Sequence, residues 1–359
     1  MLIGIDASRA FITQRTGVEE YSHQIIKRLI PLLSKDQVVL YVRNNQSVDF
    51  ILPENWKIKK IKQPYLWTQI GLSLELLFHS VDVLFVPAHT VPLVHPKNTI
   101  VVIHGLEYEF CPEAYSFQAR LYMRWSIKNS CRWAKKIVAV SENTKKDLMK
   151  LYRVLEDKIE VIYEGYNGEL RTADYKLQNR NILNPYLLFV GRLEERKNIV
   201  GIIKTFEILK EQYKLSHKLV LAGNFGYGKE KIQESISNSN FKKDIILPGY
   251  ISESEKWEIL KNADVFLFPT FYEGFGIPIL EAQSVGVPVV AGDNSSMPEI
   301  TEKSAILVDS KNAEQIADAV YKIITDKAFR EDIIEKGYKN AERFSWEKCA
   351  NEIAKILTK

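Results

Sequence analysis

Short runs of consecutive hydrophobic residues alternate with longer amphipathic segments along nearly the whole chain. The runs are rich in Val, Ile and Leu and are bounded by polar residues, a pattern typical of strands that are buried on both faces in parallel sheets. The predicted strands cover residues 2–6, 38–42, 57–61, 83–86, 100–104 and 137–140, and then 186–190, 219–222, 245–247, 265–268, 287–290 and 305–308.

Between these runs, hydrophobic residues recur at helical spacing. The predicted helices cover residues 18–33, 67–78, 117–134, 143–152, 199–213, 229–237, 254–262, 278–285, 313–325 and 329–343, and a last one over about 345–357, with Ser345 as its N-cap. Regular alternation of strand and helix predicts an α/β protein with doubly wound parallel sheets.

The chain has 359 residues, more than a single hydrophobic core usually serves. The alternating pattern restarts at Tyr186, after a polar segment over 167–184 that we interpret as a linker. We therefore expect two Rossmann-like domains facing a cleft. The first spans 1–170, the second spans 171–344, and the last helix, about 345–359, packs back on the first.

Composition and charge narrow the classes of function. The balance of 46% hydrophobic and 26% charged residues is ordinary for a globular protein, and a net charge of +4 is too small to indicate nucleic-acid binding. One segment is locally basic, with Lys57, Lys59, Lys60 and Lys62. It is either the solvated face of an exposed strand or a contact with an anionic membrane or acceptor.

The three cysteines, Cys111, Cys131 and Cys349, are widely spaced and suggest neither a disulfide framework nor a zinc site. Together with an N-terminus that lacks the pattern of a signal peptide, they favour a cytoplasmic protein, with peripheral contact at the inner face of the cytoplasmic membrane as an extension. The apolar stretch 66–94 is interrupted by polar residues and is interpreted as a helix followed by a strand.

Two loops that follow predicted strands carry candidate chemistry, because ligands of such sheets bind beyond the carboxyl ends of the strands. After strand 186–190 come Gly191, Arg192 and Lys197, then a helix, so two cations lie where an anion is favoured. Read alone, this is equally an exposed charged loop balanced by Glu194 and Glu195.

The second loop follows strand 265–268. It contains Glu273, Gly274 and Gly276, and Pro278 then begins a helix in which Glu281 lies about one turn in. The two glycines let the backbone approach a ligand closely. The amides of Phe275, Gly276 and Ile277 would lie at a helix N-terminus, which suits a diphosphate or a sugar hydroxyl.

These residues resemble those of the retaining glycosyltransferases of family 4, also called glycosyl transferases group 1, which have the GT-B fold. The resemblance covers most of the chain. It is carried by an E-x7-E element from Glu273 to Glu281, a G-R-x4-K element with Arg192 and Lys197, the stretches 286–291 and 298–300, and a strand–helix junction over 139–145.

The resemblance implies transfer of a hexose from a nucleotide-diphosphate sugar, slightly favouring a GDP-mannose-like over a UDP-sugar donor, to a glycan or lipid-linked glycan. Arg192 and Lys197 would bind the diphosphate, and Glu281 the ribose hydroxyls. Glu273, with Gly274, Phe275, Gly276 and Ile277, would bind the transferred sugar, and Tyr250 and Ile251 would adjoin the nucleobase. No cofactor or metal is expected, since no Asp-x-Asp follows a strand.

The resemblance also reaches the first half of the chain. His104 would lie near the sugar, although Gly105 stands where family members often carry Asp, and a histidine there is also a candidate core residue. Only Gly17 represents the family's glycine turn beside the donor phosphates. Arg9 and Phe11 would line the acceptor side, with the aromatic segment 106–124. His89 is either a cleft residue or a plain loop histidine.

We expect the reaction to proceed by front-face transfer, with fixed cations and amides stabilising the leaving diphosphate. Both glutamates are assigned to binding, so no covalent intermediate is expected. A nucleotide-sugar epimerase, a phosphorylase and a donor-binding subunit without catalysis are the alternatives. A nicotinamide oxidoreductase is disfavoured, because no G-x-G-x-x-G follows the first strand.

Overall fold

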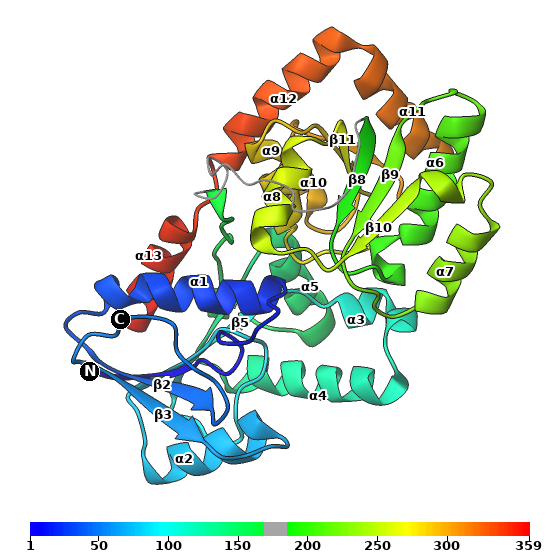
Figure 1. The fold of residues 1–359 in the computed structure, drawn as a ribbon. Coiled ribbons are helices and arrows are strands. Elements are labelled where there is room, and N and C mark those ends of the chain that lie inside the picture. The colour runs from blue at the N-terminus through cyan, green and yellow to red at the C-terminus, as the bar shows by residue number, and fades with distance from the viewer. Residues whose placement is uncertain (169–184) are drawn as a thin grey trace. The chain divides into compact units, whose positions relative to one another are not determined.

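The computed structural model describes residues 1–168 and 185–359 and shows two compact α/β units (Figure 1). The first unit is Met1–Leu106, Phe117–Gly165 and Phe344–Lys359, and the second is Glu107–Ser116 and Tyr166–Arg343. The sequence-based division had placed 107–116 in the first domain, whereas here this segment packs with the second unit. Most of the expected linker lies outside the described residues.

The first unit has a seven-stranded, fully parallel sheet with the order β3-β2-β1-β4-β5-β6-β7. Its strands are β1 (Leu2–Asp6), β2 (Gln37–Arg43), β3 (Trp56–Ile61), β4 (Val83–Val86), β5 (Asn98–Ile103), β6 (Lys136–Ala139) and β7 (Ile159–Val161). Its helices are α1 (Gly17–Leu32), the π-helical turn η1 (Trp67–Leu72), α2 (Ser73–Phe78), α4 (Phe117–Trp133), α5 (Glu142–Tyr152), the 3-10 turn η3 (Glu156–Lys158) and α13 (Trp346–Leu357).

The second unit has a six-stranded parallel sheet with the order β10-β9-β8-β11-β12-β13. Its strands are β8 (Tyr186–Val190), β9 (Lys218–Ala222), β10 (Ile245–Gly249), β11 (Val265–Phe268), β12 (Val289–Gly292) and β13 (Ile306–Val308). Its longer helices are α6 (Ile199–Glu211), α7 (Lys229–Asn238), α8 (Glu253–Lys261), α9 (Ile277–Ser284), α11 (Ala313–Thr325) and α12 (Lys327–Ala341). Its shorter turns are α3 (Glu107–Phe110), η2 (Pro112–Ala114), η5 (Glu195–Lys197), η6 (Lys242–Asp244) and α10 (Met297–Thr301).

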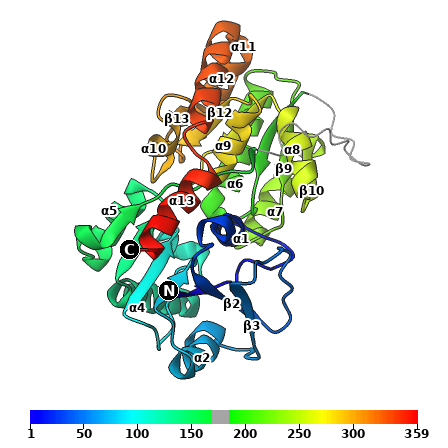
Figure 2. The same cartoon turned by 90° about the vertical axis from the view of Figure 1, so that its left-hand side faces the viewer.

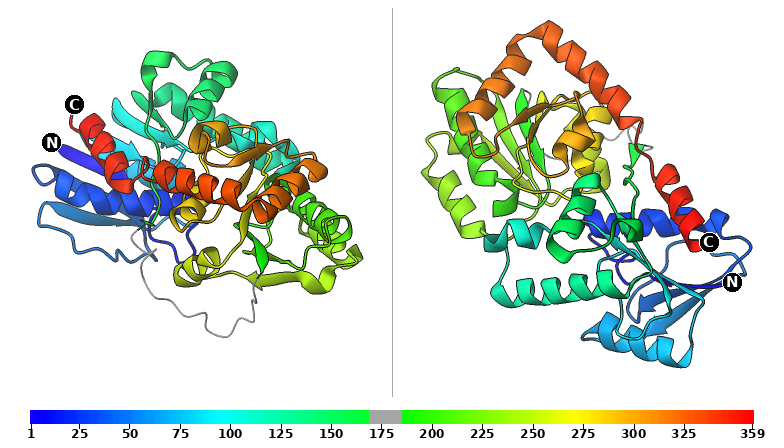
Figure 3. Two further views of the ribbon diagram at one scale, coloured as in Figure 1. Left: turned by 90° about the horizontal axis from the view of Figure 1, so that it is seen from above. Right: turned by 180° about the vertical axis from the view of Figure 1, so that it is seen from behind.

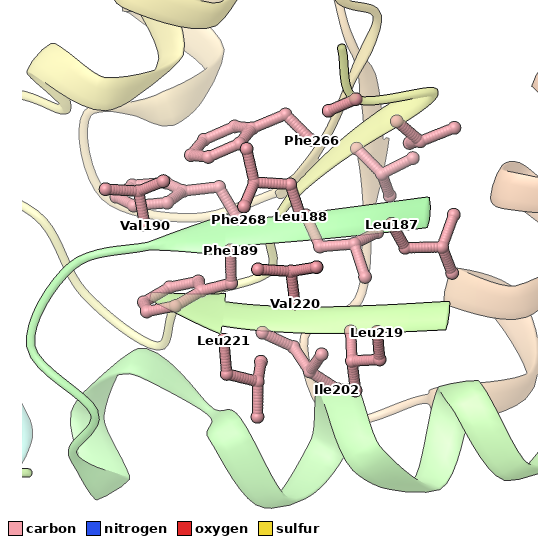
Figure 4. Close-up of a cluster of buried hydrophobic side chains, with 14 of the residues drawn as sticks. Leu187, Leu188, Phe189, Val190, Ile202, Leu219, Val220, Leu221, Phe266 and Phe268 are labelled. Atoms are coloured by element: carbon pink, nitrogen blue, oxygen red, sulfur yellow. The ribbon is translucent and has the colours of Figure 1, made fainter. Parts of the chain in front are cut away.

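Helices cover both faces of the second sheet, with α6 beside α11 and α9 beside α12 (Figure 3). The central strands are therefore buried on both faces, which explains their unbroken hydrophobic sequence. Figure 4 shows part of this core, in which side chains of β8, β9 and β11 pack between the layers. Phe189 and Phe268 stack with ring centroids 6.2 Å apart.

The C-terminal helix α13 packs along α1 (Figure 2). Ser345 is its N-cap and accepts a hydrogen bond from the Lys348 amide, as the sequence predicts. Where the two helices meet, the ring of Tyr21 on α1 lies edge-on to the ring of Trp346 on α13, with centroids 5.9 Å apart. The last helix thus completes the core of the first unit.

The predicted fold class, two Rossmann-like parallel-sheet domains, is confirmed, and the predicted strands lie within a few residues of the observed ones. The helix expected over 67–78 begins instead with the wider π-helical turn η1. Sequence reasoning missed β7, α3 and α10. The three residues of β7 are interrupted by Glu160, and helices of four or five residues are too short to show helical periodicity.

Gly223 offers a test of the packing between the ends of β8 and β9. A Cβ there would lie 1.9 Å from the Gly191 carbonyl oxygen, and Gly223 has φ +142°. Gly249 has φ +74° but open space around the Cβ position. We expect Gly249→Ala to lower the free energy of unfolding by about 1 kcal/mol, through backbone strain alone. Gly223→Ala should cost roughly 3 kcal/mol, because the clash adds to the strain.

Denaturant unfolding of both variants measures this difference. Equal losses of stability would contradict the close backbone approach.

Candidate functional site

The strand order of the second sheet reverses between β8 and β11. From β8 the chain winds outward through β9 and β10, and from β11 it winds the other way through β12 and β13. In open parallel sheets, ligands bind at this switch point, beyond the carboxyl ends of the strands. The two loops that sequence analysis singled out, 191–198 after β8 and 269–276 after β11, both begin there.

Hydrogen bonds hold these two loops together. Asn198 has φ +58° and a buried side chain, whose amide donates to the Pro269 carbonyl at 3.0 Å and to the Ser310 carbonyl at 2.5 Å. The Phe271 amide donates to the Arg196 carbonyl at 3.0 Å. Loops that are otherwise far apart in sequence are thereby fixed as one rigid surface.

Glu273 is the centre of a buried charge cluster. Its Oε1 accepts hydrogen bonds from Lys197 Nζ at 2.5 Å and from Arg196 Nη1 at 2.9 Å. Arg196 also donates to the Tyr272 carbonyl at 2.7 Å and to Glu194 at 2.9 Å. No described residue donates a hydrogen bond to the second carboxylate oxygen, Oε2. One oxygen of Glu273 is thus held by two cations, whereas the other accepts no hydrogen bond from a described residue.

The cations decide the charge state of Glu273. Burial alone would raise the pKa of its carboxyl, but Arg196 and Lys197 outweigh burial, and the pKa lies below its ordinary value. Burial lowers the pKa of Lys197, an effect that Glu273 opposes. Burial also disfavours the charged form of Arg196, but Glu273, Glu107 and Glu194 raise its pKa above the ordinary value. The cluster therefore keeps Glu273 ionised at neutral pH.

Arg192 differs from Lys197 in its surroundings, although the sequence pairs them. The Arg192 side chain is exposed and makes no ion pair with any residue that the structure describes. Lys197 has only 12% of its side chain exposed, pairs with Glu273 and lies over the Phe268 ring, 5.1 Å from its centroid. The loop after β8 thus carries two different cations. The Arg192 guanidinium is exposed and has no ion-pair partner among the described residues, whereas the Lys197 ammonium is held in place by Glu273.

Side chains from the loop after β12 support the backbone around Glu273. The Glu273 amide donates to Ser295 Oγ at 3.0 Å, and Ser296 Oγ donates to the carbonyls of Glu273 and Phe275, each at 2.9 Å. Gly276 caps α9 with φ +115°, and a Cβ there would lie 2.8 Å from Met297 Cε. The predicted helix start over Gly276 and Ile277 is thus set by both conformation and space.

Glu281 lies in α9 and is buried. Its Oε1 accepts a hydrogen bond from Lys256 Nζ at 2.6 Å, and Lys256 also pairs with Glu253 at 2.9 Å. Burial opposes the charge on Lys256, yet Glu281 and Glu253 raise its pKa above the ordinary value. Lys256 is on α8, the helix that follows Tyr250 and Ile251. Tyr250 is exposed and Ile251 is buried.

Arg196 and Lys256 are the site residues that sequence reasoning missed. Charged residues are common at both positions, because Arg196 lies in a loop with four other charged residues and Lys256 lies on an amphipathic helix. Only the fold shows that each one is buried against a predicted site glutamate. One signal could have indicated them. If Glu273 and Glu281 are both buried, each carboxylate needs a cation nearby.

The segment 107–116 adds a wall of aromatic residues next to Glu273. The Phe110 and Tyr272 rings stack with centroids 4.6 Å apart and an interplanar angle of 9°. Cys111 and Ala114 are buried against Tyr272, and burial raises the pKa of the Cys111 thiol to about 11. Part of the aromatic segment 106–124, expected on the acceptor side, therefore packs on the loop that carries Glu273.

His104 belongs to the first unit, at the end of β5. Its Nδ1 is 2.7 Å from Glu164 Oε1, and its Nε2 is 2.8 Å from the Pro87 carbonyl. A carbonyl can only accept, so Nε2 is the donor in the second contact. Both nitrogens are thus used within the unit. His89 lies beside this ring at 5.2 Å, and burial, with His104, lowers its pKa well below the ordinary value.

Gly17 is the first residue of α1, and Thr16 is its N-cap in a capping box with Glu19. The structure leaves open space where a Cβ of Gly17 would lie, and its φ is not positive. Neither conformation nor packing within the described residues requires glycine here. Arg9 pairs with Glu19 at 3.2 Å, and Phe11 packs edge-on against Phe50 at 5.3 Å.

Comparison with known proteins identifies the family of the chain. A sequence model of Glycosyltransferase Family 4 matches residues 16–170, and one of Glycosyl transferases group 1 matches residues 176–340. The chain belongs to this family of glycosyltransferases. Both models together leave only short stretches unmatched, and the fold has the two Rossmann-like domains of the GT-B class.

Named relatives support the enzyme class. The chain is 27% identical to the O-antigen chain mannosyltransferase B of Escherichia coli over 262 residues, covering 71% of this chain and 69% of the relative. It is 27% identical to the O-antigen chain mannosyltransferase RfbU of Salmonella typhimurium, covering 85% of this chain and 89% of the relative. The structure of a sucrose-phosphate synthase from Thermosynechococcus elongatus superposes with a TM-score of 0.77 at 17% identity, covering 99% of this chain and 97% of the other.

The charge on Glu273 should make stability depend on pH. Because the folded-state pKa is below the ordinary value of 4.5, Glu273 stabilises the fold above that pH, and this contribution is lost as the pH falls through the folded-state pKa. Glu273→Gln removes the charge while keeping the shape. We expect it to cost about 3–5 kcal/mol at pH 7, since two buried cations lose their partner.

Chemical unfolding between pH 7 and acid pH measures this. The gap between wild type and Glu273→Gln should narrow as the pH falls below about 4.5. As a control, Asp332→Asn breaks the exposed Lys336–Asp332 pair and should leave stability nearly unchanged. A gap that stays constant with pH would contradict the buried charge cluster.

Proposed function

We propose that this glycosyltransferase transfers a hexose from a nucleotide-diphosphate sugar with retention of anomeric configuration, without a metal ion. The observation that carries the proposal is Glu273, whose Oε1 is held by Arg196 and Lys197 while Oε2 is left for a ligand. An ionised carboxylate fixed in this way suits hydroxyl groups of the transferred sugar. The exposed Arg192, in the loop after β8, suits the diphosphate.

Each part of the donor has a proposed partner in the second unit. Arg192 and Lys197 bind the diphosphate, with amides of Gly274, Phe275, Gly276 and Ile277 at the start of α9 around the sugar and phosphates. Glu281, held by Lys256, binds the ribose hydroxyls. Tyr250 and Ile251 adjoin the nucleobase.

Breaking the bond between sugar and diphosphate places negative charge on the leaving group. Cations already fixed near that group stabilise the charge without rearrangement in the transition state. Lys197 is fixed in advance by Glu273, which favours this mode of stabilisation over a mobile cation. We propose front-face transfer, in which the leaving phosphate takes the proton of the acceptor hydroxyl. Glu273 binds substrate and is not a nucleophile.

A mannose donor carried by GDP is slightly favoured, because two of the relatives named above are mannosyltransferases. A uridine donor is the alternative, since the loops around the diphosphate serve both nucleotides with the same chemistry. The proposed acceptor is a glycan or a lipid-linked glycan at the cytoplasmic side of a membrane. In the first unit, Gly17 is proposed to adjoin the donor phosphates, and His104 to act near the sugar with Glu164 orienting its ring.

A screen of nucleotide sugars by thermal shift tests donor binding. A ligand of the folded state at ~100 times its dissociation constant adds about 2.7 kcal/mol of stability, which is an upward shift of several degrees in Tm. We expect one nucleotide sugar to produce that shift in the wild type. Stabilisation by none of them would contradict the donor site. Conversion of a donor to its epimer without any acceptor would instead identify an epimerase.

Substitution of Arg192 tests the assignment of the leaving-group cations. Arg192→Ala removes an exposed side chain, so stability should be unchanged, while kcat falls by ~100-fold or more and donor affinity changes less. Lys197→Ala should also lower kcat, but with a loss of stability because Glu273 loses a partner. The exposed Lys243→Ala serves as the control. Wild-type turnover in both Arg192→Ala and Lys197→Ala would overturn the assignment.

Gly17→Ala separates a ligand contact from a structural role. Because the Cβ would meet open space and alanine favours helices, stability should be equal or slightly higher. If Gly17 adjoins the donor, the KM for the donor should rise several-fold. Unchanged steady-state kinetics in a fully folded variant would remove Gly17 from the site.

A further inference from the structure

An unusual apolar stripe lies on the surface of the first unit, along η1 and α2. Leu66, Ile70, Leu74, Leu77 and Phe78 are all exposed, Phe78 with 75% of its surface accessible. They recur every three or four residues, so they share one face. The opposite face is buried, with Trp67, Leu72 and Leu76 packed inward. The segment is therefore apolar on both faces, although only one faces the core.

Helix α4 carries a second such surface. Phe117, Leu121, Tyr122 and Trp125 are exposed, whereas Ile127 and Cys131 are buried. The helix contains four basic residues and no acidic one. The basic residues are Arg120, Arg124, Lys128 and Arg132. An amphipathic helix with aromatic residues and only positive charges is typical of segments that lie in the interface of a membrane.

The two surfaces lie on the same face of the first sheet. The connections from β3 to β4 and from β5 to β6 run in the same direction along the strand order, so right-handed crossovers place α2 and α4 on one face (Figure 1). The loop after β4 joins them. The Gln69 side chain donates to the Val91 carbonyl at 3.2 Å, and the Val91 amide donates to Ser130 Oγ at 2.8 Å. Leu93 of the same loop is exposed.

These three segments hold a disproportionate share of the exposed apolar surface. Of the twenty-two large hydrophobic side chains that are exposed in the described residues, eleven lie within 65–78, at Leu93 or within 117–125. Contiguous apolar surface of this kind marks an interaction site, whereas scattered exposed residues do not. We refer to the residues of η1–α2, Leu93 and α4 as the apolar–basic face.

The charge around the apolar–basic face is positive. Lys57 lies on the edge strand β3, on the same face as Lys59 and Ile61, and η1 packs closely on that face: a Cβ on Gly71 would be 2.8 Å from Gln63 Cβ and 2.9 Å from Ile61 Cγ2. The acidic Glu75 of α2 is compensated by Lys59 at 2.9 Å. Exposed leucines and aromatics within a basic surround complement an anionic lipid surface, where the apolar side chains enter and the cations meet the headgroups.

We propose that the apolar–basic face docks the enzyme on an anionic lipid bilayer. No helix within the described residues is long and apolar enough to cross a membrane. The proposed contact is with the surface of the bilayer. The proposed surface consists of two helical segments and a loop, next to the basic strand β3. The docking proposal depends on the proposed function in one respect only: docking would bring the enzyme to a lipid-linked acceptor. Binding to lipid needs neither donor nor acceptor, so its failure and the failure of the transferase activity are separate results.

Cosedimentation of the full chain with vesicles tests the proposal. We expect binding to vesicles of phosphatidylcholine mixed with phosphatidylglycerol, little binding to phosphatidylcholine alone, and weaker binding as salt is raised. The double variant Leu74→Glu, Leu77→Glu should weaken binding at least about tenfold. Lys128→Gln should weaken it about fivefold. Both changes are at exposed positions, and near-ultraviolet circular dichroism checks the fold.

Matched controls lie on α1, on the opposite face of the same sheet. Leu32→Glu and Lys27→Gln change exposed residues of the same types and should bind vesicles like the wild type. The proposal fails if the wild type does not bind anionic vesicles, or if the α2 and α4 variants bind as well as these controls. A wild type that self-associates without lipid and becomes monomeric in Leu74→Glu, Leu77→Glu would assign the face to a second copy of the chain instead, and would also overturn the proposal.

Discussion

The arrangement at Glu273 constrains much of the second unit. A buried carboxylate is costly unless cations and hydrogen bonds compensate it, and here Arg196 and Lys197 both bind the same oxygen. These cations come from the loop after β8, whereas the glutamate comes from the loop after β11. The loops must therefore emerge side by side, which the reversal of strand order between β8 and β11 provides. The supporting bonds from Asn198, Ser295 and Ser296 hold that geometry.

The same interaction links stability to function. The ion pairs compensate the charge of Glu273 and engage only its Oε1, while Arg192 stays exposed. In the proposed mechanism, Glu273 Oε2 and Arg192 bind the donor. A site built in this way needs little reorganisation when charge develops on a leaving group, which is the condition for strong electrostatic stabilisation. Glu281 is a second buried carboxylate whose charge is compensated by a cation, because Lys256 pairs with it in α9.

Much of the fold could be predicted from the sequence, because strands buried on both faces read as unbroken hydrophobic runs and the long helices are strongly periodic. The interrupted strand β7 and the four-residue helix α3 could not be predicted, because neither forms an unbroken hydrophobic run or shows helical periodicity. Glu273 and Glu281 could be singled out as candidates from their spacing and the glycines between them. Arg196 and Lys256 did not, because nothing local distinguishes a buried cation from a solvated one. The packing of 107–116 on Tyr272 likewise depends on contacts remote in sequence.

A structure of the enzyme with a bound nucleotide-diphosphate sugar would test the central claim most directly. The account predicts the diphosphate beside Arg192 and Lys197, a hydroxyl of the sugar within hydrogen-bond distance of Glu273 Oε2, and the ribose at Glu281, with the Arg196–Glu273 contact retained. A donor bound with its diphosphate away from Arg192 and Lys197, or a bound state in which Glu273 leaves Arg196 to act elsewhere, would contradict it.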